Sequence, residues 1–256
     1  MIAENGMMLN ESKMYENGLI EADVDLERIT QERQRIGTWL PSYSDSIKEV
    51  NFTFEDVTAE KFVPEREIGR LPFVPSDERA LFERAKGILD IQVHRLASRI
   101  KHIGCENVVL GLSGGLDSTL ALIVCVQTYD LLKISRDKIK TISMPGFGTT
   151  PRTKSNAEKL SAALGCGYNE ISIAKAVRQH FEDIGQSEDL RDITYENAQA
   201  RERTQVLMDI ANQCSGIVIG TGDLSELALG WATYNGDHMS MYAVNSSIPQ
   251  NLVKHM

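Results

Sequence analysis

The feature that most constrains the fold is a regular alternation of short apolar runs and helix-like segments after Pro75. The pattern predicts strands over 107–112, 138–144, 168–173 and 216–220. It predicts helices from a cap at Ser76 or Asp77 to Ile103, and over 120–132, 151–164 (after a cap at Thr150), 174–184, 195–214 and 224–229. Alternating strands and helices imply a parallel sheet with helices on both faces. The predicted fold class is therefore α/β, with a doubly wound, Rossmann-like parallel sheet.

The first 75 residues follow a different pattern. Residues 18–26 alternate apolar and polar side chains, which predicts a half-buried strand. Residues 27–39 are predicted to be helical, and Pro41 would end that helix. From 42 onwards the chain is irregular and contains several prolines, as linkers do. We therefore expect an N-terminal arm here, with no hydrophobic core of its own.

Composition narrows the class of protein. The chain has 256 residues, 27 Lys and Arg against 36 Asp and Glu, and a net charge of −9, which argues against a nucleic-acid partner. Its longest apolar run, Leu120–Val126, is too short to cross a bilayer, and no signal peptide begins the chain. The four cysteines form no C-x-x-C pair, so we expect buried, reduced thiols and no zinc site. These features predict a cytoplasmic protein with no membrane contact.

The segment Ser113-Gly114-Gly115-Leu116-Asp117-Ser118 carries the clearest chemical signal. It follows a predicted strand and opens a helix, where glycines and unpaired backbone amides can bind phosphate. A carboxylate would repel phosphate, so Asp117 fits this loop if it holds Mg²⁺. The lysine of the G-x-x-x-x-G-K-[ST] loop is missing, and G-x-G-x-x-G does not match either. The alternative is a simple turn that caps a helix.

A second segment, residues 220–230, follows the last predicted strand and should face the first loop across the carboxyl edge of the sheet. Glu226 could complete a Mg²⁺ site with Asp117, and Thr221 could donate a hydrogen bond to a nucleotide. The alternative is that Asp223 and Ser225 cap a short helix and that Glu226 is a solvated acid in its first turn.

The first loop resembles the pyrophosphate loop of the ATP pyrophosphatase (PP-loop) superfamily, S-G-G-x-D-S. Together with Tyr195–Arg203 (YENAQARER) and Trp231–Asp237 (WATYNGD), residues 220–230 closely resemble the NAD synthetase family in its long, glutamine-dependent branch. The resemblance runs from about Ser76 to the C-terminus. It implies an adenine nucleotide alpha hydrolase-like fold and a ligase that forms NAD from deamido-NAD (nicotinic acid adenine dinucleotide). In that reaction ATP adenylates the nicotinate carboxylate and ammonia displaces AMP, with pyrophosphate as the other product.

The resemblance also implies roles for individual residues. Asp117 and Glu226 would be catalytic and would bind Mg²⁺. ATP would be bound by Gly111, Leu112, Ser113, Gly114, Gly115, Leu116, Asp117, Ser118, Met144 and Thr221. Deamido-NAD would be bound by Asn197, Arg203, Glu226, Trp231, Ala232, Thr233 and Tyr234. Arg201 and Arg203 point in different directions on a helix, and we expect Arg203 to reach a phosphate. No histidine is assigned a role.

The resemblance divides the chain into three parts. Residues 1–40 resemble the last strands and helix of the family's nitrilase-like glutaminase domain, 41–75 would be a linker, and 76–256 an NAD synthetase domain that is incomplete at its C-terminus. The Cys-Glu-Lys triad of such glutaminases cannot be matched in this chain. We therefore expect free ammonia, and not glutamine, to be the nitrogen donor. The glutaminase domain would supply ammonia in the full-length enzyme, and the family implies a homo-oligomer.

Two other functions stay open at this point. One is another adenylating member of the superfamily, such as a tRNA thiolase, although the net charge of −9 and the cysteine spacing argue against it. The other is a non-catalytic module that binds nucleotide without turnover. An assay for AMP release with ATP, Mg²⁺, deamido-NAD and ammonia would separate the three.

Overall fold

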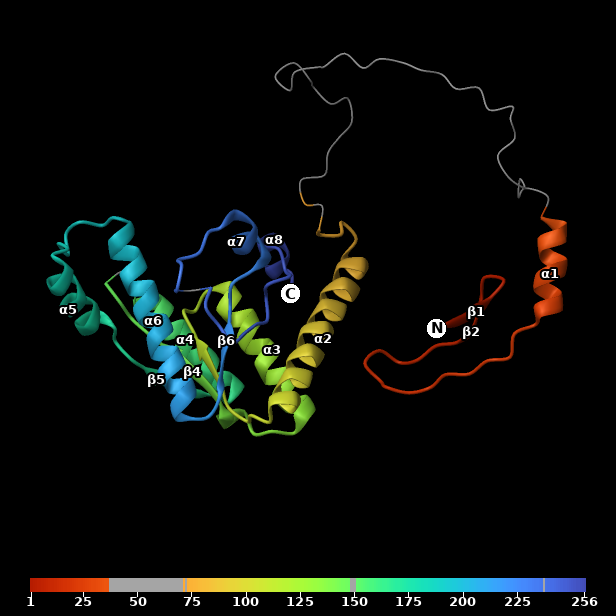
Figure 1. The fold of residues 1–256 in the computed structure, drawn as a ribbon, viewed down its shortest axis with the longest axis horizontal. Helices are drawn as coiled ribbons and strands as arrows, with labels where there is room; N and C mark the ends of the chain where they lie inside the picture. Colours follow the sequence, from red (N-terminus) through yellow and green to blue (C-terminus); the bar gives the residue numbers. More distant parts are fainter. Residues whose placement is uncertain (37–70, 72, 148–150, 237) are drawn as a thin grey trace, which may run out of the picture. The chain divides into compact units, whose positions relative to one another are not determined.

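The computed structural model of the chain describes residues 1–36, 71, 73–147, 151–236 and 238–256, with no side chains for 151–155 (Figure 1). The chain divides into two compact units, Met1–Ile68 and Gly69–Met256. Across the described part of the chain, no helix is both long enough and apolar enough to cross a membrane.

The first unit contains a hairpin and a helix. Strands β1 (Ile2–Glu4) and β2 (Met7–Asn10) pair antiparallel. Asn5 and Gly6 both have positive φ, as the turn of a two-residue hairpin requires. Helix α1 (Leu26–Arg35) is capped by Asp25, whose backbone N–H donates to the carboxylate of Glu4 at 2.8 Å. No hydrophobic side chain among the described residues of this unit is buried.

The strand predicted over 18–26 is wrong. Residues 18–25 form no regular element, and Leu26 already belongs to α1. Leu19 is 84% exposed, because no neighbouring strand or core covers this stretch. The predicted helix is confirmed as far as Arg35, while its expected end, Pro41 and most of the irregular stretch lie outside the described residues. The hairpin was not predicted.

The second unit is built on a parallel sheet, which has five strands among the described residues. In spatial order these are β5 (Gly167–Glu170), β4 (Ile139–Ser143), β3 (Val108–Gly111), β6 (Ile217–Gly220) and β7 (Tyr242–Ala243). The chain runs outward from β3 through β4 to β5 and then returns to β6 on the other side of β3. The strand order therefore reverses between β3 and β6, and the predicted doubly wound sheet is confirmed. The two-residue strand β7 was not predicted, and β5 ends three residues before Ile173.

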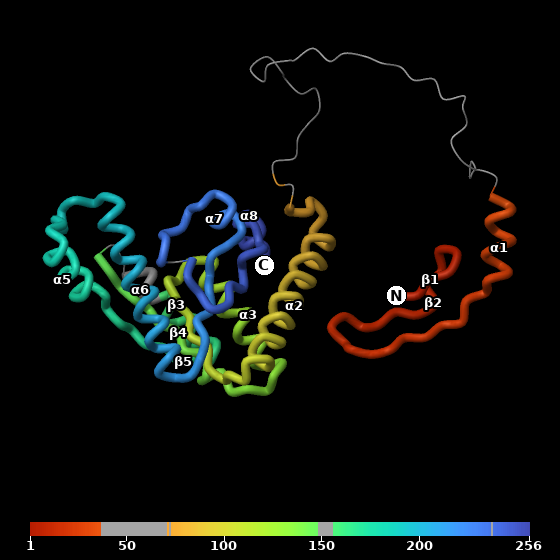
Figure 2. Tube along the Cα trace, viewed as in Figure 1, coloured from red at the N-terminus to blue at the C-terminus, as the bar shows by residue number. Residues whose placement is uncertain are grey.

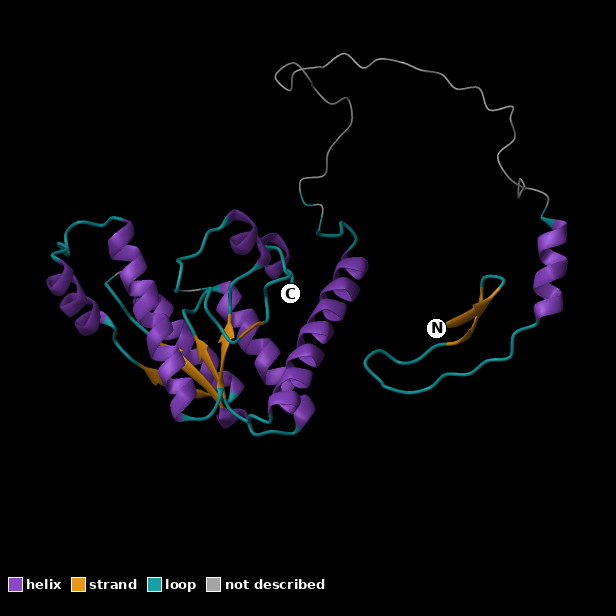
Figure 3. Ribbon diagram, viewed as in Figure 1, coloured by secondary structure: helices purple, strands orange, loops and turns teal. Residues whose placement is uncertain are grey.

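Helices cover both faces of this sheet (Figure 3). They are α2 (Glu78–Ile103), α3 (Leu116–Leu132), α4 (Pro151–Leu164), α5 (Ala174–Ile184), α6 (Ile193–Gln213), α7 (Leu224–Leu229) and α8 (Gln250–Val253), with a 3₁₀ turn at Arg136–Lys138. In β3, Val108 and Leu110 point into the core cluster that contains residues of α2 and α3. Between them, Val109 packs with Ala211 of α6 on the opposite face. The alternation of side chains along one strand thus builds two separate cores.

Most predicted helix boundaries are close to the observed ones. Asp77 is confirmed as the cap of α2, since its carboxylate accepts from the Ala80 N–H at 2.7 Å. Helix α3 begins four residues earlier than predicted, at Leu116, directly after the glycine loop. The expected cap at Thr150 lies outside the described residues. The short helix α8 was not predicted, because four residues carry too little periodicity to be recognised.

Candidate active site

The two segments singled out in the sequence follow neighbouring strands. Strands β3 and β6 are paired in parallel register from Val108 with Ile217 to Leu110 with Ile219. The glycine loop leaves β3 and the second loop leaves β6 at the same edge of the sheet. Because this is the point where strand order reverses, it is the expected place for a ligand in such a fold.

The glycine loop is held in a tight turn by its own hydroxyl groups. Ser113 Oγ accepts from the Gly115 N–H and lies 3.2 Å from Ser118 Oγ, which contacts the Gly115 carbonyl oxygen at 3.1 Å. Gly114 has φ +81°, a conformation that favours glycine. No side chain caps α3, whose N-cap residue is Gly115. The first amides of α3 therefore lack a side-chain acceptor, which is the arrangement that binds anions at helix N-termini.

Asp117 lies in the first turn of α3 and carries an unsatisfied carboxylate oxygen. Its Oδ1 atom is buried and has no hydrogen-bond partner, and the same is true of Asp223 Oδ2. Burial, and then the charge of Asp223, raise the pKa of Asp117. A buried carboxylate oxygen without a donor is costly in an apolar setting, and oxygen ligands of this kind suit a hard cation.

The carboxylates at this edge fit Mg²⁺ better than a metal held entirely by protein. Within the described ranges, no three His, Cys, Asp or Glu side chains are grouped closely enough to hold a metal ion. Mg²⁺ is usually bound by one or two carboxylates, with substrate phosphates and waters completing its coordination. Asp117 and Glu226, which line one cavity, are residues of the right kind for such a site.

The second loop ends in a capping box. Asp223, which is fully buried, accepts from the Glu226 N–H at 2.8 Å, and the Glu226 carboxylate accepts from the Asp223 N–H at 3.3 Å. The capping alternative is therefore correct for Asp223. It is wrong for Ser225, whose Oγ accepts from the Gln250 N–H at 3.1 Å. Glu226 is half-buried, so it is not the solvated acid of that alternative.

A cavity of about 480 Å³ opens between the two loops. Seven of the residues expected to bind ATP line it: Gly111, Leu112, Ser113, Asp117, Ser118, Met144 and Thr221. Three others do not: Gly114, Gly115 and Leu116. Its further lining includes residues outside the segments that the sequence singled out: Ser143, Pro145, Thr204, Leu207 and Ser240. These residues come from the end of β4 and the chain after it, from α6 and from the chain after β6, so their only signal would have been their place at strand ends and on one helix face.

A second cavity of about 690 Å³ lies beside the first. It is lined by six of the seven residues expected to bind deamido-NAD: Asn197, Arg203, Glu226, Trp231, Ala232 and Thr233. The seventh, Tyr234, does not line it. Thr233 Oγ1 donates to Asn197 Oδ1 at 2.8 Å, which ties the 231–234 segment to α6. Arg191, Asp192 and His238 also line it and were given no binding role from the sequence, while Glu196 and Leu227 lie within the singled-out segments but were not themselves expected to bind.

The two arginines of α6 have different surroundings. Arg203 lines both cavities, whereas Arg201 Nε donates to the carbonyl oxygen of Tyr234 at 3.1 Å. The cavities also have Gly220, Gly222, Glu226 and Ser240 in common. Gly220 packs tightly against Ser240, since a Cβ atom at Gly220 would clash with Ser240 Oγ. The two cavities therefore share one wall that carries a cation and a carboxylate.

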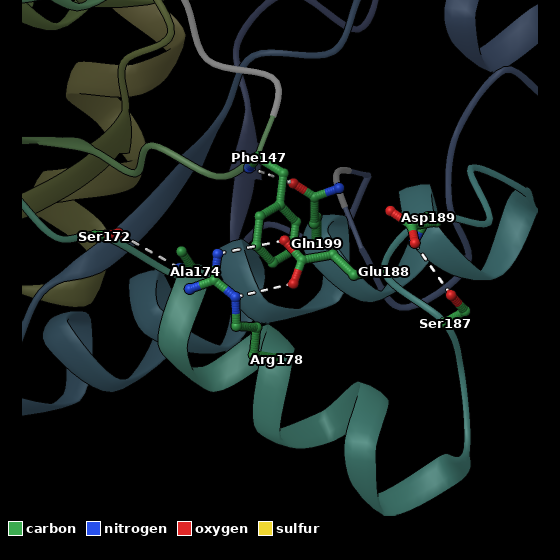
Figure 4. A network of polar contacts seen from close by, with 8 residues as sticks. All are labelled: Phe147, Ser172, Ala174, Arg178, Ser187, Glu188, Asp189 and Gln199. Carbon is green, nitrogen blue, oxygen red and sulfur yellow. Dashed lines mark hydrogen bonds and ion pairs between the residues drawn. The ribbon is translucent and has the colours of Figure 1, made fainter.

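A polar and aromatic network holds the chain after β4 against α5 and α6 (Figure 4). The Phe147 N–H donates to Gln199 Oε1 at 3.1 Å, and the Phe147 ring lies 5.1 Å from the guanidinium carbon of Arg178. Arg178 in turn bonds both carboxylate oxygens of Glu188, at 2.9 and 3.3 Å. Met144, three residues before Phe147, lines the first cavity, so this network holds the chain that continues from the cavity wall.

The cysteines take no part in the first two cavities. All four are free; Cys125 is buried, and the other three are half-buried, so burial is less complete than expected. Burial raises the pKa of Cys166 to about 11, which keeps this thiol protonated at neutral pH.

Comparison with known proteins identifies the family. The profile of the family described as NAD synthase matches residues 88–254. The chain belongs to the NAD synthase family. It is 42% identical over 269 residues to the glutamine-dependent NAD(+) synthetase of Mycobacterium bovis, an alignment that covers 100% of this chain and 40% of that one. It is 28% identical over 252 residues to the enzyme of the same name from Thermotoga maritima, with 95% and 40% covered. The chain thus spans about two fifths of the length of these NAD synthase relatives.

Solved structures show the same fold. The glutamine-dependent NAD+ synthetase of Acinetobacter baumannii, in complex with ADP, matches with a TM-score of 0.61 and 28% identity over 66% of this chain and 31% of that chain. The NH3-dependent NAD synthetase of Campylobacter jejuni matches with a TM-score of 0.59 and 26% identity over 66% of this chain and 70% of that chain. The resemblance to the NAD synthetase family and the predicted fold class are therefore confirmed.

Proposed function

We propose that this chain carries the synthetase activity of a glutamine-dependent NAD synthetase, the ATP-dependent amidation of deamido-NAD. ATP would occupy the cavity between the two loops, and deamido-NAD the neighbouring cavity. The observation that carries this proposal is the wall that the two cavities share, with Arg203 and Glu226 on it. Two substrates bound in adjoining cavities that share lining residues would lie next to each other. Holding them together in this way lowers the entropic part of the barrier to their reaction.

The proposed reaction has two steps. An oxygen of the nicotinate carboxylate attacks the α-phosphorus of ATP, the bond to the β-phosphate oxygen breaks, and pyrophosphate leaves. Ammonia then attacks the acyl carbon of the resulting adenylate, loses a proton to solvent or a nearby base, and releases AMP. Both steps move negative charge among phosphate oxygens, so positioned donors and cations can lower the barrier without a covalent enzyme intermediate.

The residues take roles that follow from their positions. The amides that begin α3, with Ser113 and Ser118, would bind the phosphates, and Met144 would lie beside the adenine. Arg203 would neutralise phosphate charge at the shared wall. Asp117 and Glu226 would hold Mg²⁺, which when bound supplies positive charge to the leaving pyrophosphate. Asn197 and the 231–234 segment would bind deamido-NAD.

We also propose the domain assignment that the resemblance implies. Residues 1–40 would be the end of a nitrilase-like glutaminase domain, 41–75 a linker and 76–256 the synthetase domain. Ammonia, and not glutamine, would serve as nitrogen donor for this chain, and its functional form would be a homo-oligomer.

An assay of products tests the function directly. The purified chain is mixed with ATP, Mg²⁺, deamido-NAD and ammonium chloride, and AMP and NAD are measured by chromatography. We expect equal amounts of AMP and NAD, no products without deamido-NAD, and no NAD when glutamine replaces ammonium. Nucleotide binding without turnover would contradict the catalytic proposal and would favour a binding module. AMP release that needs tRNA would indicate another adenylating enzyme.

A further inference from the structure

We infer that Asn245 is a positioning residue, which holds the two nucleotide-binding loops at a fixed separation. Asn245 follows β7 and is fully buried. Its Nδ2 atom donates to the carbonyl oxygen of Asp117 at 2.9 Å and to that of Thr221 at 3.1 Å. One side-chain amide thus joins the first turn of α3 to the loop after β6. The inference rests on the proposed function, because both loops are assigned there to ATP.

The orientation of this amide is determined by its neighbours. Gln92, a buried residue of α2, donates from Nε2 to the Val244 carbonyl oxygen at 2.8 Å. The same nitrogen donates to Asn245 Oδ1 at 3.1 Å. If the Asn245 amide were reversed, its oxygen would face two carbonyl oxygens and its nitrogen would face another donor. The oxygen must therefore face Gln92, and both N–H groups must face the loops.

No strand pairing joins the loops where the cavity opens. The ladder between β3 and β6 ends at Leu110 with Ile219, and the chains then separate around the 480 Å³ cavity. Asn245 bridges them beyond that point. Its two donors are both used and both acceptors are backbone carbonyls, so the bridge sets the positions of the main chain at Asp117 and Thr221.

Asn245 is itself fixed from a second side. Its carbonyl oxygen accepts from the Ile248 N–H at 2.9 Å, and the Ile248 carbonyl oxygen accepts from the Leu224 N–H at 3.0 Å. Leu224 is the first residue of α7, whose first turn also contains Glu226. Figure 2 shows this C-terminal segment in dark blue beside α7. A shift of Asn245 would therefore move Asp117, Thr221 and the start of α7 relative to one another.

The variant Asn245→Asp tests the bridge, since it keeps the shape of the side chain but removes both donors. Two lost hydrogen bonds, with carboxylate oxygens set against two carbonyls, should weaken ATP binding about tenfold or more. Binding of deamido-NAD should weaken less than ATP binding, since neither Asp117 nor Thr221, the two residues that Asn245 Nδ2 contacts, lines the second cavity. Calorimetry on the full chain measures the dissociation constants of ATP with Mg²⁺ and of deamido-NAD. Comparing the two changes shows whether the loss of affinity is selective for ATP.

Ser161→Ala is the matched control. Ser161 is fully buried and bonds Thr141 Oγ1 at 2.8 Å and the Ala157 carbonyl oxygen at 3.0 Å, and it lines neither cavity. It should lower Tm and leave both dissociation constants unchanged. If Asn245→Asp does not fold, Gln92→Met replaces it. This substitution removes the donor to Asn245 Oδ1 and to the Val244 carbonyl oxygen, and it should weaken ATP binding two- to threefold by loosening Asn245.

The outcomes separate this inference from the proposed function. Selective loss of ATP affinity in Asn245→Asp, or in Gln92→Met, supports the positioning role. Unchanged ATP affinity in the folded variant overturns that role and leaves the proposed function intact. An equal loss of affinity for ATP and for deamido-NAD does the same. A wild-type chain that does not bind ATP overturns the proposed function and the positioning role together.

Discussion

The two loops at the carboxyl edge of the sheet look alike but use their backbones differently. Each follows a central strand, contains glycine and opens a helix. In the loop before α7, the backbone amides of Asp223 and Glu226 are already hydrogen-bonded within the loop, because these two residues form a capping box. The loop before α3 has no side-chain cap, so its amides are left for a ligand. The first loop therefore supplies backbone donors, whereas the second supplies side chains and a fixed frame.

The largest expected effect comes from the carboxylate of the first loop. Asp117→Ala removes the buried, unpartnered oxygen that suits Mg²⁺, and AMP formation should fall at least about a hundredfold. The measurement is AMP release at saturating ATP. Glu158→Ala, which removes an exposed acid of α4, should leave the rate unchanged. Mg²⁺-dependent turnover that survives in Asp117→Ala would show that the first loop does not hold the metal.

The backbone of the first loop provides the next prediction. Gly114→Ala places a side chain at φ +81°, which costs roughly 1 kcal/mol and should distort the turn before α3. ATP binding should weaken about tenfold, measured by calorimetry. Gly104→Ala is the matched control, because Gly104 has φ +67° at the end of α2, where a Cβ atom meets nothing within 4 Å. A similar loss of affinity in both variants would mean that only global stability was affected.

A smaller effect is expected from the cap of the second loop. Asp223→Ala removes the acceptor of the Glu226 N–H and should lower the free energy of unfolding by about 1 kcal/mol. Asp223→Asn keeps an acceptor at the cap and should lower the free energy of unfolding less. Urea unfolding measures both. If the two substitutions are equally destabilising, the charge of Asp223 matters more than its cap, and the contrast between the loops is weaker than described.

The smallest effect is a pH dependence of stability in the metal-free protein. Burial and the charge of Asp223 raise the pKa of Asp117, so its ionisation destabilises the folded state. Asp117→Asn should therefore have a higher Tm than the wild type at pH 7. The difference should shrink as the pH falls through the raised pKa, and it should vanish below the pKa of the unfolded chain, near 4. A lower Tm for Asp117→Asn at pH 7 would show that the carboxylate is stabilised by contacts in the folded protein.

The local pattern of apolar and polar residues was sufficient to predict much of the fold. The run Val108–Leu110 is continuously apolar, as a strand buried on both faces must be, and the helices 174–184 and 224–229 were predicted with their observed ends. The same kind of reasoning was wrong for residues 18–26. Alternation there resembles a strand, but a strand also needs a partner and a covered face, and neither is encoded within nine residues.

The candidate site was predictable to the extent that its residues lie in contiguous motifs. The residues of the glycine loop, of 220–230 and of 231–234 could be selected because strand–turn–helix order places them at one edge. Ser240 and Asn245 could not, because each acts through a contact with a residue distant in the chain. Asn245, for example, is 128 residues from Asp117, and its surrounding sequence has no pattern that indicates the contact.

The parallel α/β architecture and the chemistry of the glycine loop follow from the amino-acid sequence alone, because periodicity and glycine position are local properties of the chain. Three-dimensional packing is needed to show that Arg203 of α6 lines both cavities, and that Asp223 caps a helix while Asp117 keeps an unpaired oxygen. The same packing brings a buried amide near the C-terminus between the two loops. These properties depend on which distant groups meet in space, and burial then determines whether a polar atom finds a partner there.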